Sequence, residues 1–175
     1  MLPAARNIEL KARLSDPQAA SVIARSLAKD PPERQHQVDT YFAAAHGRLK
    51  LREIEGRGAQ LVWYARCDQA AAKSSDYRLV SVSEPAALKQ ALAAALGVVQ
   101  VVEKVRQVYF YENVRIHLDE VVGLGSFLEF EAVLGPGIDD AAGRAQVEFL
   151  QSAFRLRAAD LIENSYSDLL SKRSG

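Results

Sequence analysis

Polar and apolar residues alternate with a period of two along most of this chain. Side chains alternate between the faces of a β-strand, so residues two apart share a face. Asn7, Glu9 and Lys11 therefore share one face of an extended segment, and Ile8 and Leu10 share the other. The alternation predicts strands with one charged face and one apolar face. The predicted strands are residues 6–14, 35–42, 48–55, 60–66, 76–82, 99–111, 113–121 and 126–134.

Apolar residues at helical spacing predict three helices between these strands, and a short helical tail is expected over residues 166–170. Asp16 and Asp139 suit the N-cap of a helix, and Pro85 suits its first turn. Each helix has an apolar stripe, which must be buried against another element. The stripes are Ala20, Ile23, Ala24 and Leu27, then Leu88, Leu92 and Leu96, then Val147, Leu150 and Phe154.

The charged faces of the predicted strands differ from the surface of an ordinary sheet. A sheet with one solvated face would carry Lys, Glu, Thr and Ser in mixed order, but Arg and Lys dominate here. If the helices cover the apolar faces, the charged faces turn toward one another. The sequence therefore predicts an α+β fold, a closed or nearly closed antiparallel β-barrel of eight strands with a charged lumen and helices packed outside. The acidic positions on these faces are Glu9, Asp119, Glu129 and Glu131.

Composition narrows the class of protein. A chain of 175 residues with 49% hydrophobic and 25% charged residues fits one soluble domain over residues 1–175. The 22 basic residues balance the 22 acidic ones, which argues against nucleic acid as a partner. Cys67 is the single cysteine, so neither a disulfide framework nor a thiolate metal cluster is expected. Without a signal segment or a long apolar run, we expect a cytoplasmic protein with no membrane partner.

A charged lumen is costly when it is empty, because an unpaired buried charge costs several kcal/mol. Water lowers this cost, but a polyanion together with divalent cations suits such a lumen better. Arginine binds phosphate oxygens with two parallel hydrogen bonds, and lysine acts as a point charge. Carboxylates hold Mg²⁺ or Mn²⁺, which bridge phosphate oxygens in turn. The charge pattern therefore suggests a metal-assisted site for a polyanion.

Short motifs occur along the chain in a fixed order. The first is Asn7-Ile8-Glu9-Leu10-Lys11, which matches E-x-E-x-K at all but its first glutamate. Those that follow are Asp39-Thr40-Tyr41, Leu49-Lys50-Leu51-Arg52, Glu103-Lys104-Val105-Arg106, the segment 118–125, Glu129-x-Glu131 and the segment 165–170. This series resembles the CYTH superfamily of class IV adenylyl cyclases and thiamine triphosphatases, also called triphosphate tunnel enzymes. The segments 104–109 and 119–125 look most like the class IV cyclase branch.

The resemblance implies a tunnel of eight antiparallel strands in which basic residues grip a triphosphate and acidic residues hold one or two Mg²⁺ or Mn²⁺ ions. It implies metal ligation by Glu9, Glu129 and Glu131, and also by Asp119. Lys11 and Asp119 are the expected catalytic residues. The phosphate-binding residues expected from the resemblance are Lys11, Lys50, Arg52, Arg66, Arg78, Lys104, Arg106 and Arg115.

Three functions remain open at this point. The first is a class IV adenylyl cyclase-like enzyme, which makes cyclic AMP and pyrophosphate from ATP. The second is a triphosphatase acting on inorganic triphosphate, thiamine triphosphate or a nucleotide, with Lys11 activating water. The third is a non-catalytic sensor of a polyphosphate or nucleotide, suggested by Asn7 in place of the first motif glutamate. The expected partner is a nucleoside triphosphate or another polyphosphate, and a homodimer is left open.

Three other residues have ordinary structural interpretations. A single histidine on a polar strand face is most often a hydrogen-bonded wall residue, and we interpret His117 in this way. Trp63 is expected to face outward and to pack under a helix. Tyr166, in the C-terminal motif, is expected to anchor packing rather than to catalyse.

Overall fold

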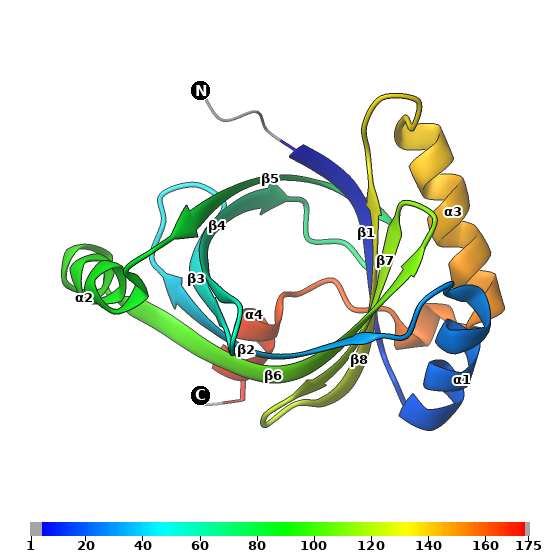
Figure 1. Cartoon of the computed structure of the whole chain (residues 1–175), viewed down its shortest axis with the longest axis horizontal. Helices are drawn as coiled ribbons and strands as arrows, with labels where there is room; N and C mark the ends of the chain where they lie inside the picture. Colours follow the sequence, from blue (N-terminus) through cyan, green and yellow to red (C-terminus); the bar gives the residue numbers. More distant parts are fainter. Residues whose placement is uncertain (1–4, 174–175) are drawn as a thin grey trace.

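The computed structural model describes residues 5–173 and contains eight antiparallel strands that close into a barrel (Figure 1). Around the barrel the order is β1-β5-β4-β3-β2-β6-β7-β8, and β8 pairs with β1 to close it. The predicted barrel is therefore confirmed. The strands are β1 (Ala5–Arg13), β2 (Glu33–Phe42), β3 (Arg48–Ile54), β4 (Gly58–Arg66), β5 (Lys73–Val82), β6 (Val98–Tyr111), β7 (Val114–Val121) and β8 (Gly125–Val133).

The pairing of β1 with β8 defines which side chains face the lumen. Glu9 pairs with Glu131 and Lys11 pairs with Glu129. Partners directly across a strand pair project on the same side of the sheet, so these charged residues share the inner face. The neighbouring residue Leu10 is buried outside the lumen, against the helices. The facing predicted from the alternation is confirmed for both strands.

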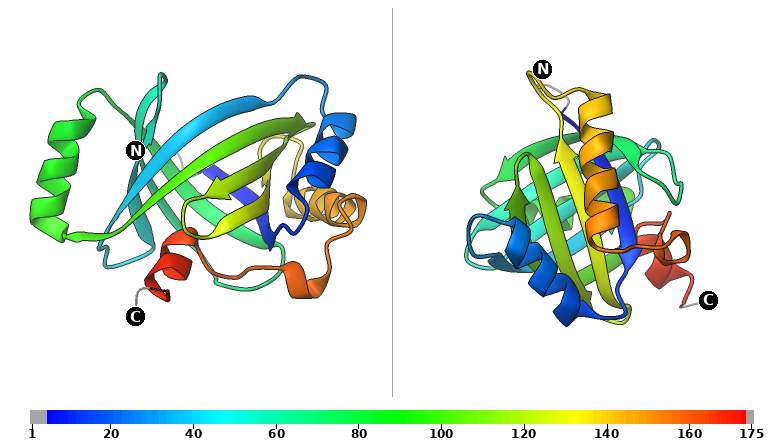
Figure 2. Two further views of the ribbon diagram at one scale, coloured as in Figure 1. Left: turned by 90° about the horizontal axis from the view of Figure 1, so that it is seen from below. Right: turned by 90° about the vertical axis from the view of Figure 1, so that its right-hand side faces the viewer.

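Two helices cover one side of the barrel: α1 (Pro17–Leu27) and α3 (Asp140–Ala153) pack outside β1, β7 and β8 (Figure 2). Each begins at an aspartate, Asp16 or Asp139, whose carboxylate accepts a hydrogen bond from a backbone N–H of the first turn. The remaining helical elements are α2 (Pro85–Leu96), the 3₁₀ turn η1 (Ala158–Asp160) and α4 (Tyr166–Ser171). No helix among residues 5–173 is long and apolar enough to cross a membrane.

The main core lies between the barrel wall and these two helices. Phe130 is fully buried there, and its ring meets the ring of Phe154 edge-on with 5.3 Å between the centroids. Gly143 lets α3 approach the wall closely, because a Cβ atom at this position would lie 2.7 Å from Cδ2 of Leu134. This core fixes β1 and β8, the two strands that carry most of the acidic residues of the lumen.

The helix α2 is less buried than its apolar stripe predicts. Leu88 and Leu92 pack against Phe42 and Leu51 of β2 and β3, but Leu96 is 40% exposed. No residue of this helix is fully buried. Figure 1 shows the reason: α2 lies at one end of the molecule, beside the rim of the barrel rather than over its wall.

Trp63 faces outward from β4, as expected, but the loop before β3 lies against it instead of a helix. Its Nε1 donates a hydrogen bond to the carbonyl oxygen of His46 at 3.0 Å. The strand β5 also differs from prediction, because it begins at Lys73 rather than at Asp76. Lys73 pairs with Glu9, so these three extra residues extend the wall beside the acidic strand.

Candidate functional site

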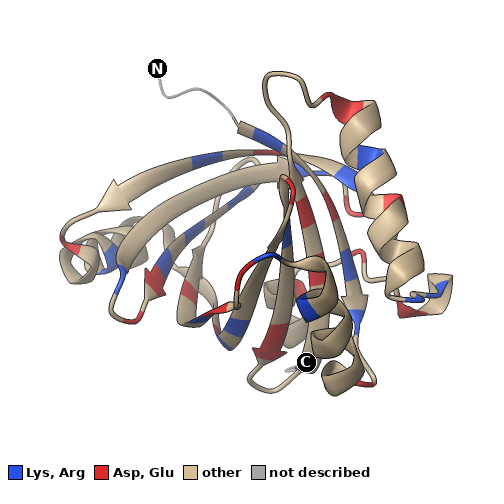
Figure 3. Ribbon diagram, turned by 45° about the vertical axis from the view of Figure 1, so that its right-hand side comes forward, with Lys and Arg blue, Asp and Glu red and all other residues tan. Residues whose placement is uncertain are grey.

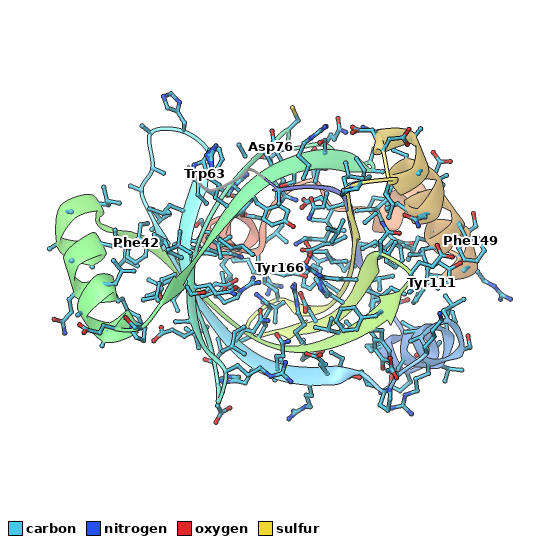
Figure 4. All side chains as sticks on the ribbon, turned by 45° about the horizontal axis from the view of Figure 1, so that its top comes forward. Phe42, Trp63, Asp76, Tyr111, Phe149 and Tyr166 are labelled. Carbon is cyan, nitrogen blue, oxygen red and sulfur yellow. The ribbon has the colours of Figure 1, made fainter. Side chains whose placement is uncertain are left out.

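The lumen holds a cavity of about 160 Å³ whose wall is highly charged. Figure 3 shows basic and acidic positions in bands along the strands, and Figure 4 shows Tyr166 within the ring of strands. Seven basic side chains face three carboxylates there, so the wall carries an excess of positive charge. The charged lining residues are Lys11, Lys50, Arg52, Arg66, Lys104, Arg106, Arg115, Glu9, Glu129 and Glu131.

The acidic side of the cavity is formed by β1 and β8. Glu129 is buried, with Lys11 Nζ 3.1 Å from its Oε1 and Arg106 Nη2 2.8 Å from its Oε2. Burial opposes ionisation of Glu129. The charges of Lys11 and Arg106 and a hydrogen bond with His117 outweigh burial and hold the pKa of this carboxyl well below its usual range. Glu129 is therefore an anion in the folded protein.

The other two lumen carboxylates each have an arginine partner. Glu9 forms an ion pair with Arg66 of β4. Glu131 lies 3.6 Å from Arg115, and its side chain is 19% exposed. Glu131 is thus the most accessible of the three carboxylates, because the side chains of Glu9 and Glu129 are each 9% exposed.

Asp119 lies behind the cavity wall rather than on it. Both of its carboxylate oxygens accept hydrogen bonds from Arg106 at 2.6 Å, and Oδ2 also accepts from the hydroxyl of Tyr166 at 2.8 Å. Burial opposes ionisation, but Arg106 outweighs it and lowers the pKa of Asp119 to about 2. In the ligand-free structure both carboxylate oxygens of Asp119 are therefore occupied by partners from the protein. Its catalytic and metal-ligating roles stay predictions.

A second buried aspartate, Asp39 of β2, was absent from the residues predicted for the site. Its carboxylate accepts hydrogen bonds from Lys50 at 2.8 Å, from Lys104 at 2.9 Å and from two nitrogens of Arg52 at 2.7 and 2.8 Å. Two sequence signals point to it: the Asp39-Thr40-Tyr41 motif, and the alternation that places Asp39 on the same face as Tyr41. We call the group of Asp39, Lys50, Arg52 and Lys104 the basic cluster.

The two lysines of the basic cluster have unusual charge states. Burial lowers the pKa of Lys104 to about 7, and Asp39 opposes this effect while Arg52 adds to it. Burial likewise lowers the pKa of Lys50 to about 8, again against Asp39. Arg52 stays charged. Burial lowers its pKa, but Asp39 outweighs burial and raises the pKa above its already high ordinary value. Both lysines therefore gain or lose their proton near neutral pH.

Arg78 does not reach the cavity. It pairs with Trp63 on the outer face of the barrel, and its guanidinium carbon lies 5.6 Å from the centroid of the Trp63 ring. The neighbouring residues Tyr77 and Leu79 face the lumen instead. The expectation that Arg78 grips phosphate in the tunnel is therefore corrected, because β5 turns this side chain to the opposite face.

The C-terminal segment completes the wall of the cavity. The backbone N–H of Ile162 donates to the carbonyl oxygen of Lys11 at 2.8 Å, which places the segment against β1. Tyr166 lines the cavity and packs on Phe127 with 4.9 Å between ring centroids. The centroid of its ring lies 3.7 Å from Lys11 Nζ. Tyr166 is thus the packing anchor expected from sequence, and it also contacts a predicted site residue, a contact that the sequence interpretation did not include.

A divalent cation fits the acidic side of the cavity. His117, Glu129 and Glu131 each offer one ligand atom within 4.8 Å of the others, and carboxylate oxygens are the ligands that Mg²⁺ and Mn²⁺ prefer. The amide oxygen of Asn7 is buried without a hydrogen-bond partner, and Asn7 lines the same cavity. His117 is also a wall residue as expected, with Nδ1 3.5 Å from Glu129.

A barrel of this topology, with cations and carboxylates facing each other in its lumen, is the architecture that the motif series indicated. The CYTH domain family model matches residues 5–166, and the chain therefore belongs to the CYTH family. No curated protein matches the sequence significantly.

Solved structures with the same fold have low sequence identity to this chain. The PH1012 protein of Pyrococcus horikoshii matches with a TM-score of 0.82 and 22% identity, over 93% of this chain and 98% of the other. A provisionally named adenylate cyclase from Vibrio parahaemolyticus matches with a TM-score of 0.75 and 23% identity, over 94% of this chain and 97% of the other. HpAC1 from Hippeastrum is a provisionally named adenylyl cyclase with a dominant triphosphatase activity. It matches with a TM-score of 0.63 and 15% identity, over 97% of this chain and 96% of the other.

Proposed function

We propose that this protein is a divalent-metal-dependent enzyme that binds the triphosphate of ATP inside the barrel and converts ATP to cyclic AMP and pyrophosphate. The observation that carries the proposal is the cavity in the barrel lumen, in which seven basic side chains face three carboxylates. The cations match the charge of a triphosphate, and the carboxylates match a divalent cation bound to it. A family of cyclases and triphosphatases provides the context.

The wall of β4 and β5 supports a substrate with an organic group over inorganic triphosphate. Val62 and Leu79 pair across these strands and both line the cavity, and Tyr64 and Tyr77 pair beside them in the same way. An inorganic polyphosphate needs no apolar surface, whereas a nucleoside has an apolar face that such a wall can contact. This wall therefore favours a nucleoside triphosphate.

Residues on different strands take separate roles in this proposal. Lys50, Arg52 and Lys104 of the basic cluster bind phosphate oxygens on one side of the cavity, and Arg66, Arg106 and Arg115 bind them on the other. Glu9, Glu129 and Glu131 would hold Mg²⁺ or Mn²⁺, and the bound ion would supply positive charge to the phosphates and to the leaving group.

We assign Lys11 to the phosphate oxygens on which negative charge develops. Its ammonium is held by Glu129 and is positioned to stabilise the phosphate oxygens during reaction. The ribose 3′-hydroxyl forms the new bond to the α-phosphorus, the bond from that phosphorus to the β-phosphate breaks, pyrophosphate leaves, and the hydroxyl proton passes to solvent.

Triphosphate hydrolysis is the second candidate, and it is supported by the same Lys11–Glu129 pair. Lys11 lies on the acidic side of the cavity, where it can orient water toward the terminal phosphate. The HpAC1 structure from Hippeastrum shows that a protein of this fold can be a dominant triphosphatase. The cyclase reaction attacks the α-phosphorus, whereas the triphosphatase reaction attacks the terminal phosphorus. Both reactions would use the same charged wall of the cavity.

A product assay separates the candidates. Purified protein is incubated with ATP and Mn²⁺, and cyclic AMP, ADP, pyrophosphate and orthophosphate are quantified, with a chelator as control and with inorganic and thiamine triphosphate as further substrates. Cyclic AMP and pyrophosphate in equal amounts support the proposal. ADP and orthophosphate without a cyclic product would overturn it in favour of the triphosphatase. Thermal stabilisation by triphosphates, with turnover far below about 1 s⁻¹ on every substrate, would instead indicate a sensor.

A further inference from the structure

Three neighbouring strands bring three cations onto one buried carboxylate. Asp39 lies on β2, Lys50 and Arg52 lie on the adjacent strand β3, and Lys104 lies on β6 at the other side. The side chain of Asp39 is 1% exposed and lies behind the cavity surface, whereas its three partners all line the cavity. Asp39 itself is therefore placed behind the surface that a ligand in the cavity would contact.

We propose that Asp39 is a positioning residue that holds Lys50, Arg52 and Lys104 on the cavity wall as a preassembled receptor for phosphate groups. This inference rests on the proposed function, because it assumes that a triphosphate enters the cavity. It assigns a role to a residue whose carboxylate is hydrogen-bonded to side chains that would bind the substrate.

The hydrogen bonds leave donors for a ligand. An arginine has five N–H donors and a lysine ammonium has three. Asp39 takes one N–H from Nε and one from Nη2 of Arg52, and one from each lysine. Donors therefore remain on all three cations while their side chains are held in place. Ordering them before binding lowers the entropy lost when the ligand arrives.

The carboxylate of Asp39 counteracts the effects of burial and of neighbouring cations on the pKa of the two lysines. Lys104 faces Lys50 and Arg52 on β3, Arg106 on its own strand, and the ring of Tyr166 from α4 at 5.7 Å. Burial and these cations favour the neutral form of Lys104, whereas Asp39 and the charge of Asp119 oppose them. Asp39 likewise opposes burial at Lys50. Loss of the carboxylate would lower the pKa of both lysines further and leave them uncharged at mildly alkaline pH.

A positioning role predicts a pH dependence that a purely structural role does not. Inorganic triphosphate binding is measured by titration calorimetry between pH 6 and pH 8.5 for the unaltered protein, Asp39→Asn, Asp39→Glu and Asp76→Asn. Asp76 is the matched control, because it pairs with Arg6 on the outside of the barrel and its side chain is 55% exposed. Changes in the ionisation of the ligand itself affect all four proteins equally, so the ratio between proteins isolates the lysines.

We expect Asp39→Asn to bind triphosphate at least about tenfold more weakly than the unaltered protein at pH 8, and we expect a smaller difference at pH 6, where more of each lysine is protonated. Asp39→Glu keeps the charge but moves the carboxylate, so it should weaken binding at every pH and keep the unaltered pH profile. Asp76→Asn should match the unaltered protein throughout.

Equal binding of Asp39→Asn and the unaltered protein at pH 8, or a ratio that does not change with pH, would overturn the positioning role. If Asp39→Asn fails to fold, Asp39→Glu decides, because unaltered affinity in this variant would overturn the role equally. Failure of the unaltered protein to bind both inorganic triphosphate and ATP would count against the proposed function itself, so the two failures are distinguishable.

Discussion

Lys11 and Glu129 form an ion pair across the seam where the barrel closes. The two residues are direct partners in the pairing of β1 with β8, and Nζ of Lys11 lies 3.1 Å from Oε1 of Glu129. Both side chains are less than a tenth exposed, and the ring of Tyr166 lies 3.7 Å from the same Nζ. The pair therefore places a cation among the carboxylates on the acidic side of the cavity.

Replacing Lys11 with glutamine should reduce kcat/KM for the triphosphate substrate by about a hundredfold or more, because a preorganised donor at developing charge contributes this much. Steady-state kinetics of product formation measures the effect. Lys29→Gln is the control, since Lys29 is exposed at the end of α1. Lys11→Gln with the kcat/KM of the control would show that Lys11 takes no part in the reaction.

Replacing Glu131 with glutamine should weaken Mn²⁺ binding by about tenfold and remove metal-dependent activity, while the fold stays intact. The reason is the loss of one anionic ligand in a cavity rich in cations. Calorimetric titration with Mn²⁺ measures the affinity, and Glu148→Gln on the exposed face of α3 serves as control. Unchanged Mn²⁺ affinity would exclude Glu131 as a ligand.

Replacing Phe130 with alanine should lower the free energy of unfolding by about 3–5 kcal/mol, because it leaves a cavity between the barrel and the C-terminal end of α3. Phe149→Ala is the matched control: its ring is 49% exposed and stacks on Tyr111 at the surface, so its loss should cost about 1 kcal/mol. Denaturant unfolding measures both. A smaller loss for Phe130→Ala than for Phe149→Ala would contradict the position of the core.

The alternation of side chains made the barrel and the facing of β1 and β8 predictable. Those strands have a helix-covered outer face, so their apolar residues mark the outside. Arg78 was misplaced because no apolar stripe marks the outer face of β5 around it: Arg78 is half-buried over Trp63 on that face, and Tyr77 and Leu79 face the lumen. The role of Asp39 depends on contacts with Lys50 and Lys104, 11 and 65 residues away, which exist only after the barrel closes.

The stability of the ligand-free protein should rise between pH 7 and pH 9. Burial lowers the pKa of Lys104 to about 7, whereas an unfolded lysine has a pKa of about 10.4. Between these values the unfolded chain binds more protons than the folded one, so raising the pH favours the folded state. Lys50, with a pKa of about 8, acts with the same sign.

Thermal unfolding at pH 7 and pH 9 measures this effect. The Tm should increase by about 2 °C or more in the unaltered protein, since 1 kcal/mol corresponds to about 2–4 °C for a chain of this size. The increase should shrink in Lys104→Met and persist in the surface control Lys29→Met. A Tm that falls from pH 7 to pH 9 in all three proteins would contradict the neutral state of Lys104.

Asn7 occupies the position of the first glutamate in the E-x-E-x-K signature, and restoring the acid should strengthen metal binding. Its amide oxygen is buried, lacks a hydrogen-bond partner and belongs to a residue that lines the cavity near Glu9. A carboxylate there would add an anionic oxygen, and the seven cations of the wall would offset its charge.

We expect Asn7→Glu to bind Mn²⁺ about tenfold more tightly than the unaltered protein, because a charged ligand replaces a neutral one. Asn7→Gln is the matched control: it has the length of glutamate without the charge and should show no gain. Calorimetric titration with Mn²⁺ in the absence of substrate measures all three proteins. An equal gain in Asn7→Gln would attribute the effect to side-chain length, and no gain in Asn7→Glu would show that position 7 lies outside the reach of the metal.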